Sequence, residues 1–298
     1  MRIREPGKIR DHLWYLGCEE SGVYLLEGQD ESMIISGGIS YILPHVLQQI
    51  RAFGIQENRI RKFLILHAHF DHVGIVPFLK RRHPELQIYG SSRAFEILSM
   101  PKAINTINAF SDMVAARMGR VEDCAGLDLE WREDVDGASV SEGDQIGIDD
   151  IEVQIFETPG HSSCSISAYV PQIKALFPSD GGGIPYRDTI ITPGNSNFTL
   201  FQQSLEKLKD LDVEYHCADH YGYIVGEEAG DFIQQTIRTA KQNRSLMEEA
   251  YLRTRDIDAA AHELVTAFYE SYPDYVLSKE IFQGIYGQMV RHIAKTLE

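Results

Sequence analysis

The hexapeptide His67–His72, with the sequence HAHFDH, constrains the fold of this chain more than any other segment. It brings four side chains that can bind metal within six residues. The apolar run Phe63–Leu66 before it predicts a short buried strand, and Val73–Leu79 after it predicts a turn that enters a helix. The hexapeptide therefore lies on a loop at the end of a core strand, where a rigid backbone lets polar side chains converge.

The spacing within the hexapeptide suits two adjacent metal ions. Side chains repeat every two residues in an extended backbone, so His67 and His69 point to the same side and can bind one ion. If the chain turns sharply after Phe70, Asp71 and His72 can bind a second ion beside the first. Imidazole and carboxylate suit zinc, iron or manganese, of which manganese is the least expected. The alternative, a histidine-rich surface loop, is disfavoured by the aspartate and the third histidine.

Three later segments offer further ligands. His161 follows a strand of alternating polarity, on a Pro-Gly turn that exposes its side chain. Asp180 ends a short apolar run and precedes three glycines, which allow the backbone to approach a metal or a substrate closely. His216 and His220 follow a helical segment, and either of them can supply a ligand. Together these residues suffice to complete two metal sites.

The motifs occur in the order H-x-H-x-D-H, T-P-G-H-S, a strand-terminal aspartate, and a late histidine followed by Gly222. This combination resembles the metallo-β-lactamase superfamily of metal-dependent hydrolases, over residues 20–225. The resemblance implies an α/β fold, a four-layer αβ/βα sandwich with a C-terminal helical extension. It also implies that the late ligand is His220 and that His216 is a strand residue. The implied ligands are His67, His69 and His161 for the first metal, Asp71, His72 and His220 for the second, and Asp180 as the bridge between both.

A second resemblance covers nearly the whole chain. Gly37–Ser40 after a strand, Leu64–His67, Gly74–Leu79 and the helical C-terminus are similar to the quinolone-signal response proteins. Those proteins are 2-aminobenzoylacetyl-CoA thioesterases of the same superfamily. The resemblance implies a thioester substrate of the acyl-CoA kind. The substrate-contacting residues of that group match no clear positions here, so none is assigned.

Several departures from the superfamily pattern surround the implied ligands. Ser36 stands where many members carry aspartate, Leu66 where threonine is common, and Ser179 where glycine is usual. Asp219 and Tyr221 flank the late histidine, where glycine is more typical on both sides. The serine at position 36 puts in question one hydrogen bond that would orient a metal ligand. All seven ligand positions are nevertheless kept.

The implied site predicts a dinuclear metal-dependent hydrolase that acts on a thioester or an ester, such as an acyl-CoA. Two divalent ions, zinc or iron, lower the pKa of a bridging water, and the resulting hydroxide attacks the substrate carbonyl. The metal charge stabilises the oxyanion that forms. Asp71 is the predicted catalytic residue, because it can orient the nucleophile and pass a proton to the leaving group. A thiolate leaves without strong protonation, which suits a thioester.

Other functions use the same ligands. A glyoxalase-II-like thioesterase, a lactonase or a phosphodiesterase would need the same two metals. β-Lactamase activity is less expected, because secreted lactamases carry signal peptides and the first residues here lack an apolar segment of that kind. From another class, a regulatory or binding protein could keep a vestigial or slow metal site. The seven intact positions favour catalysis over that alternative.

Composition narrows the predicted partners to small molecules. The net charge of −16 opposes binding to nucleic acid or to an anionic membrane surface. No apolar run is long enough to predict a transmembrane helix. Four scattered cysteines are typical of reduced thiols in a cytoplasmic protein. Lys80–Arg82, at a predicted helix C-terminus, either complements the helix dipole or contacts a CoA phosphate. A homodimer is left open.

The order of the secondary structure is predicted from hydrophobic periodicity and from the Pro, Gly and Asp residues that begin or end the periodic segments. The predicted strands lie within 13–40 and at 63–66, 87–90, 151–156, 165–170 and 174–178. The predicted helices lie at 42–54, 75–82, 92–119 with a break near Pro101, 198–211, 227–254, 257–271 and 279–297.

The chain is predicted to divide into a catalytic domain at 1–226 and a helical extension at 227–298. The extension either packs on the sandwich as an appendage or caps the active site and narrows its mouth. The candidate wall residues on and near the extension are Tyr221, Tyr223, Phe268, Tyr269, Tyr275, Phe282 and Tyr286. The apolar residues of the long helical stretch that could face the site are Ile104, Ile107, Met113 and Met118.

Overall fold

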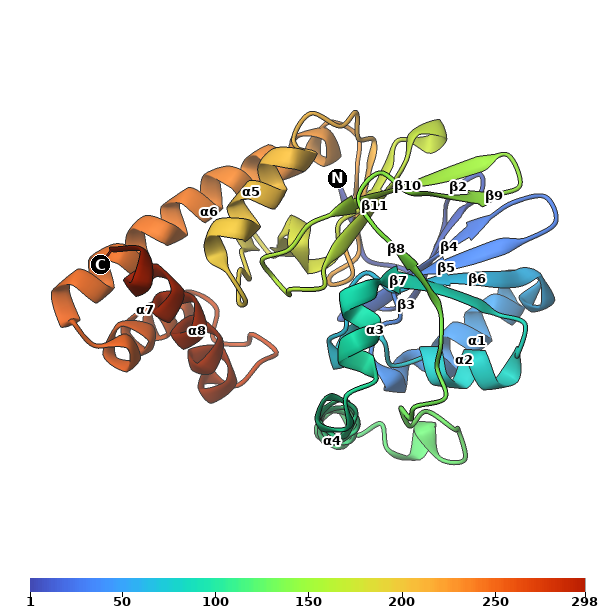
Figure 1. The fold of residues 1–298 in the computed structure, drawn as a ribbon, viewed down its shortest axis with the longest axis horizontal. Coiled ribbons are helices and arrows are strands. Elements are labelled where there is room, and N and C mark those ends of the chain that lie inside the picture. The colour runs from blue at the N-terminus through green and yellow to red at the C-terminus, as the bar shows by residue number, and fades with distance from the viewer. Residues whose placement is uncertain (298) are drawn as a thin grey trace.

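Two β-sheets stack face to face in the computed structural model, which describes residues 1–297 (Figure 1). The first sheet has seven strands in the order β2 (Gly7–Arg10), β3 (Leu13–Cys18), β4 (Ser21–Glu27), β5 (Ser32–Ile35), β6 (Ile60–Leu64), β7 (Gln87–Ser91) and β8 (Ala138–Val140). The second sheet also has seven, in the order β1 (Arg2–Ile3), β16 (Tyr223–Val225), β15 (Tyr215–Cys217), β12 (Ala175–Phe177), β11 (Ile166–Val170), β10 (Ile151–Glu157) and β9 (Gln145–Ile148). A separate hairpin consists of β13 (Ile184–Tyr186) and β14 (Thr189–Ile191).

Helices cover the outer faces of both sheets (Figure 1). On the first sheet they are α1 (Leu43–Ala52), α2 (Val76–Arg82) and α3 (Ser92–Leu98), with α4 (Pro101–Arg117) beside the hexapeptide loop. On the second sheet they are α5 (Phe198–Leu208) and α6 (Glu227–Thr254). The remaining helices, α7 (Ile257–Ser271) and α8 (Lys279–Leu297), pack on α6 and on each other. None of the described helices combines the length and the apolarity needed to cross a membrane.

Strand β4 shows why the sheets are buried on both faces. Its side chains alternate between two hydrophobic clusters. Val23 and Leu25 belong to the cluster beneath α1 and α2, whereas Tyr24 and Leu26 belong to the cluster between the two sheets. A third cluster fills the space between the second sheet and the helices α5, α6 and α8. Three stacked cores imply four layers, so the predicted αβ/βα sandwich is confirmed.

The direction of the strands determines where the ligand loops meet. Strand β12 pairs in parallel with β15, and β11 is antiparallel to both β10 and β12. Strands β10, β12 and β15 therefore point the same way, and their carboxyl ends share one edge of the second sheet. The segment after β6 reaches this edge too, because the backbone N–H of Ile166 donates to the carbonyl of Leu66 at 2.9 Å.

Most predicted elements are found close to their predicted bounds. The three C-terminal helices lie at the predicted positions, and Asp256 caps α7 by accepting a hydrogen bond from Ala259 N–H at 2.7 Å. The strand predicted at 63–66 instead spans Ile60–Leu64, and the helix predicted to end at 211 ends at Leu208. Strands β1, β2, β8, β9, β13, β14 and β16 had no sequence prediction, because two to four residues carry too little periodicity.

The basic cluster Lys80–Arg82 is engaged within the protein. Lys80 donates to the carbonyls of Pro84 and Leu86 at 3.1 and 2.9 Å. Arg81 pairs with Asp134, and Arg82 pairs with Glu57. These contacts fix the end of α2 and the loop beside it. They favour the structural explanation of the cluster over contact with a phosphate.

Replacing Phe232 with alanine is expected to reduce the free energy of unfolding by about 3–5 kcal/mol. Phe232 lies on α6, is fully buried, and packs against His216 of β15 with ring centroids 4.3 Å apart. The substitution leaves a cavity between α6 and the second sheet. Urea unfolding followed by circular dichroism measures the loss. Leu246→Ala, on the same helix but 51% exposed, is the control and should change stability by less than about 0.5 kcal/mol.

Candidate metal centre

Four loops bring the predicted ligands to one place. The hexapeptide follows β6, His161 follows β10, Asp180 follows β12 and His220 follows β15. These four loops leave the carboxyl ends of their strands at the shared edge of the sandwich. Among the described residues, three groups of metal-capable side chains have ligand atoms within 4.8 Å of one another. The groups are His67, His69 and His161; His67, His72 and Asp180; and Asp71, His72 and His220.

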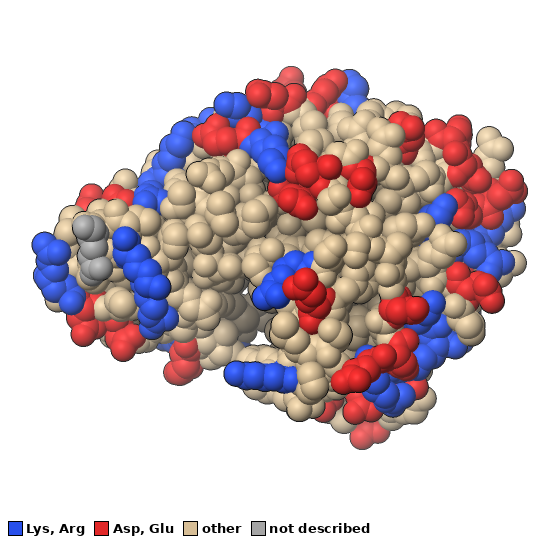
Figure 2. All heavy atoms as spheres, in the orientation of Figure 1, with Lys and Arg blue, Asp and Glu red and all other residues tan. Residues whose placement is uncertain are grey.

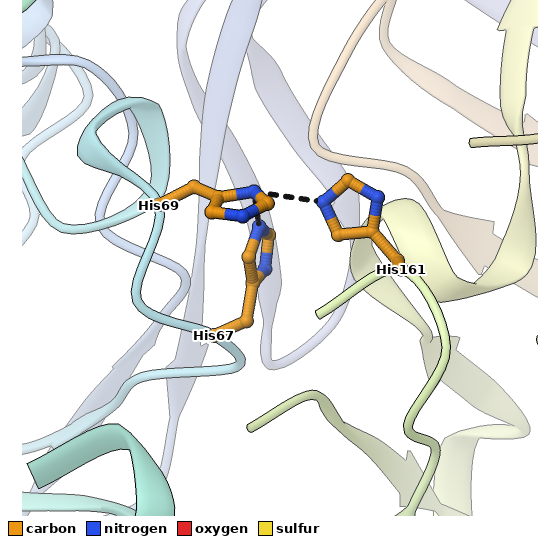
Figure 3. Close-up of side chains that lie close together, drawn as sticks. All are labelled: His67, His69 and His161. Carbon is orange, nitrogen blue, oxygen red and sulfur yellow. Dashed lines mark hydrogen bonds between the residues drawn. The ribbon is translucent and has the colours of Figure 1, made fainter. Parts of the chain in front are cut away.

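The first group consists of three imidazoles whose nitrogens converge (Figure 3). His69 Nδ1 lies 3.2 Å from His67 Nε2 and 2.9 Å from His161 Nε2. The turn that holds His161 requires glycine at position 160, which has φ 136° and packs against the start of α5. A Cβ atom at Gly160 would lie 2.2 Å from Phe201 N. The Pro-Gly turn therefore places His161 against His69 without a side chain in the way.

The second group lies directly beside the first. His72 Nε2 lies 3.2 Å from His220 Nε2, and Asp71 Oδ2 lies 3.8 Å from both nitrogens. Asp180 stands between the two groups. Its Oδ2 lies 3.3 Å from His161 Nε2 and 3.3 Å from His72 Nε2, and its Oδ1 lies 3.5 Å from His220 Nε2. The carboxylate thus faces both groups, as a bridging ligand must.

The donor set fits metal ions. Outside the centre, Nδ1 of His161 contacts the carbonyl of Pro193 at 2.8 Å, and Nδ1 of His220 contacts the carbonyl of Glu20 at 2.7 Å. These contacts fix the rings with Nε2 pointing inward, which is how protein ligands are usually oriented toward a metal. Asp180 Oδ1 is buried and has no hydrogen-bond partner among the described residues. A buried carboxylate oxygen without a partner is costly unless a cation neutralises it.

Burial also favours the ligand form of the first three histidines. It lowers the pKa of His69 to about 3, with a further contribution from the neighbouring imidazoles. Burial likewise lowers the pKa of His67 and of His161. These side chains are therefore neutral near pH 7, and neutral imidazole is the form that binds metal.

His72 and Asp180 behave as a charged pair. Burial opposes charge on both, but Asp180 and Asp71 together raise the pKa of His72 well above its usual value. At Asp180, burial alone would raise the pKa of the carboxyl. The neighbouring histidines outweigh this effect and hold the pKa well below its usual range: His72, His220 and His161. The low pKa keeps the Asp180 carboxylate ionised near pH 7, and an ionised carboxylate is the form that binds a metal cation.

Asp219 has a role that the sequence did not reveal. Its Oδ2 accepts a hydrogen bond from His72 Nδ1 at 2.8 Å and another from Ser36 Oγ at 2.9 Å. Ser179 Oγ donates to the same oxygen. Ser36 and Ser179 both have positive φ, 65° and 50°, which is uncommon for residues other than glycine and aims the two hydroxyls at Asp219. The carboxylate missing at position 36 is therefore supplied from the loop after β15.

His216 belongs to none of the three metal-capable groups. It lies on β15, as predicted, and burial lowers its pKa to about 3. Both ring nitrogens are buried without a hydrogen-bond partner among the described residues, and the ring packs on Phe232. His216 is thus a neutral core side chain.

A cavity of about 820 Å³ opens above the two groups. Asp71, His69, His161, Asp180 and His220 form part of its lining. Four of the predicted wall residues line it as well: Tyr221, Tyr275, Phe282 and Tyr286.

The other candidate wall residues do not line the cavity. Phe268 and Tyr269 pack behind the wall, in the aromatic cluster that includes Tyr275 and Phe282, and Tyr223 lies between the sheets. Of the four residues predicted on the long helical stretch, only Ile107 lines the cavity. Ile104 is buried in the core under α4, whereas Met113 and Met118 are exposed. Helix α4 therefore presents a different face to the cavity from the one expected.

Comparisons with known proteins agree with this architecture. A metallo-beta-lactamase fold-containing protein of Sulfurisphaera tokodaii is 21% identical over 250 residues, which cover 83% of this chain and 87% of the relative. A hydroxyacylglutathione hydrolase of Hahella chejuensis is 26% identical over 180 residues, covering 56% of this chain and 51% of the relative. The chain thus spans about half the length of that second relative.

A solved structure extends the likeness to the C-terminal helices. The metallo-beta-lactamase family protein of Thermus thermophilus superposes with a TM-score of 0.64 at 14% identity, covering 99% of this chain and 93% of that protein. At this identity the likeness concerns the fold alone. The sequence pattern of the Metallo-beta-lactamase superfamily matches residues 16–220, the span that contains all four ligand loops. The chain belongs to the metallo-beta-lactamase superfamily, which includes metal-dependent hydrolases.

Proposed function

We propose that this protein is a dinuclear metal-dependent hydrolase that acts on a thioester or an ester. The observation that carries the proposal is the convergence of seven donor side chains, five of which line a large cavity. In the proposed assignment, His67, His69 and His161 hold the first ion, Asp71, His72 and His220 hold the second, and Asp180 bridges them. Zinc and iron both suit this mixture of imidazole and carboxylate.

Two divalent ions held in this way would lower the pKa of a water molecule between them and polarise a substrate carbonyl. The protein supplies the orientation. Asp71 is half-buried at the edge of the cavity, so its carboxylate can accept a hydrogen bond from the attacking water and hold a proton for the leaving group. Asp71 is therefore the proposed catalytic residue. Asp219 acts through His72, whose ring it keeps in one orientation.

The thioester is proposed on two grounds. A thiolate is a good leaving group and needs little protonation. Among the described residues, Asp71 is the one acidic side chain outside the bridge that both lines the cavity and lies against ligand histidines, so protonation of the leaving group depends on it alone. The hydroxyacylglutathione hydrolase among the relatives and the resemblance to 2-aminobenzoylacetyl-CoA thioesterases support the same bond type. We further propose that residues 227–298 act as a cap on the catalytic domain, because α8 and the segment before it line the cavity.

Elemental analysis and a substrate panel test this function. We expect two zinc or iron ions per chain in protein purified without added metal, and turnover of at least one member of a panel of acyl-CoA, acyl-glutathione, lactone and phosphodiester substrates. Removal of the ions with a chelator should abolish turnover, and the same ion should restore it. If two ions are bound and only a lactone or a phosphodiester is turned over, that compound class replaces the thioester as the proposed substrate. Two ions with no turnover would favour a regulatory role, and the absence of metal binding would overturn the proposal.

A further inference from the structure

The cavity above the metal centre is walled by apolar side chains from two separate parts of the chain. Helix α4 contributes Ala103, Ile107 and Phe110. Helix α8 contributes Ile285 and Met289 from the opposite side. In Figure 1, α8 lies at the lower left and α4 at the lower middle of the view, and Figure 2 shows the surface hollowed between these two parts. The cavity is therefore a space between the sandwich and its C-terminal helices, with five of the predicted ligands at its floor.

Charged side chains are scarce in this cavity. Apart from the ligand residues Asp71 and Asp180, the charged lining residues are Glu20 and Lys102. Glu20 accepts a hydrogen bond from Tyr41 at 3.1 Å, and Lys102 is an exposed residue in the first turn of α4. A buried phosphate or carboxylate on a substrate would find no paired cation on these walls, and its desolvation would be costly. The interior of the cavity thus selects against charged groups.

We infer that the cavity between α4 and α8 binds the acyl part of the substrate, and that this part is a large, uncharged, hydrophobic group. The inference rests on the proposed function, because it places the scissile carbonyl at the metal centre. A volume of about 820 Å³ far exceeds the need of an acetyl or lactoyl group and lies in the range of pockets that enclose drug-sized ligands. The leaving group, whatever its charge, then extends toward solvent at the mouth.

This placement gives the C-terminal helices a part in specificity. The wall on the α8 side includes Phe282, which is buried, and Ile285. Phe282 packs against Tyr275 and Phe268, with ring centroids 5.1 and 4.7 Å away, so the aromatic cluster behind it fixes its position. On the α4 side, Phe110 packs against Phe70 of the hexapeptide loop, with the ring centroids 5.4 Å apart. The length of the acyl group is therefore limited by two rigid walls.

Binding of straight-chain carboxylates tests the inference without requiring catalysis. Dansyl-aminoundecanoic acid serves as a fluorescent probe, and carboxylates of increasing chain length, from butyrate to tetradecanoate, compete with it. We expect affinity to rise by up to about fourfold for each added methylene, the value for transfer of a CH₂ from water to an apolar site, until the cavity is filled. An affinity that does not depend on chain length would overturn the inference.

Replacing one of two alanines of α4 with phenylalanine locates the binding site. Ala103→Phe fills part of the cavity and should weaken binding of the longer carboxylates at least tenfold, with little effect on butyrate. Ala109→Phe adds the same side chain to an exposed position of α4 that does not line the cavity, so binding should be unchanged. Thermal unfolding of both variants shows whether they fold. Equal effects of the two substitutions, in folded proteins, would contradict the proposed location.

The outcomes separate this inference from the proposed function. If binding depends on chain length but the protein hydrolyses no ester or thioester, the hydrophobic site is supported and the proposed hydrolase function is refuted. If substrates with short polar acyl groups are hydrolysed and longer apolar acyl groups do not increase the rate, the hydrolase function is supported and the hydrophobic acyl site is refuted. The same panel of acyl-CoA substrates, extended from acetyl to tetradecanoyl, distinguishes the two results.

Discussion

Asp180→Asn is expected to lower the metal content to one ion per chain or less and to reduce hydrolysis by about 10³-fold or more. Among the described residues, Asp180 is the one carboxylate that faces both ligand groups, with Oδ2 3.3 Å from His161 and from His72. Asparagine keeps the size of the side chain but removes its charge and one acceptor oxygen. One of the two ions would lose its ligand oxygen, and the negative charge that balances both ions would fall. Elemental analysis and steady-state kinetics measure the two effects.

Asp150→Asn is the matched control, because it makes the same chemical change at an exposed turn between β9 and β10. It should leave metal content and activity unchanged. His161→Ala extends the test to a histidine of the first group and should also lower metal content. Two ions and full activity in both Asp180→Asn and His161→Ala would show that these seven side chains do not form one site.

Asp219→Ser is expected to weaken binding of the metal ion held by His72 by about 10–100-fold, the usual effect of losing a carboxylate that orients a histidine ligand. The carboxylate of Asp219 accepts the Nδ1–H of His72 at 2.8 Å, which leaves Nε2 free to face the metal centre. Serine at position 219 is too short and too weak an acceptor to take over this contact. Titration against a competing fluorescent chelator measures the affinity of each site.

A second substitution makes this prediction specific. In Ser36→Asp/Asp219→Ser, the carboxylate returns at the position where many superfamily members carry it. Aspartate also tolerates the positive φ of residue 36 better than most residues do. We expect the double variant to recover most of the metal affinity that Asp219→Ser loses. Failure of Ser36→Asp to restore any affinity, in a protein that unfolds at an unchanged temperature, would show that Asp219 contributes in another way.

The ligand loops illustrate how much the sequence could predict. The hexapeptide is detectable because its metal-capable residues are close neighbours in the sequence. Whether His67 and His69 point to the same side depends only on the local backbone period. His161 and Asp180 are equally visible, since each follows a predicted strand that ends in a recognisable turn, whereas His220 was preferred over His216 only through the resemblance to the superfamily. The structure brings these residues within ligand distance of one another, while their roles as metal ligands stay predictions.

The sequence by itself determined the three C-terminal helices, because periodicity and capping residues act over a few neighbouring positions. The sandwich and the seven candidate ligand positions followed instead from the order of the motifs and their resemblance to the superfamily. Only the tertiary structure decided which carboxylate supports His72. Ser36, Ser179 and Asp219 are separate departures in the sequence, yet they meet through hydrogen bonds that span 40 and 183 residues. The walls of the cavity were decided in the same way, because the face that α4 presents depends on its packing against distant elements rather than on its own pattern.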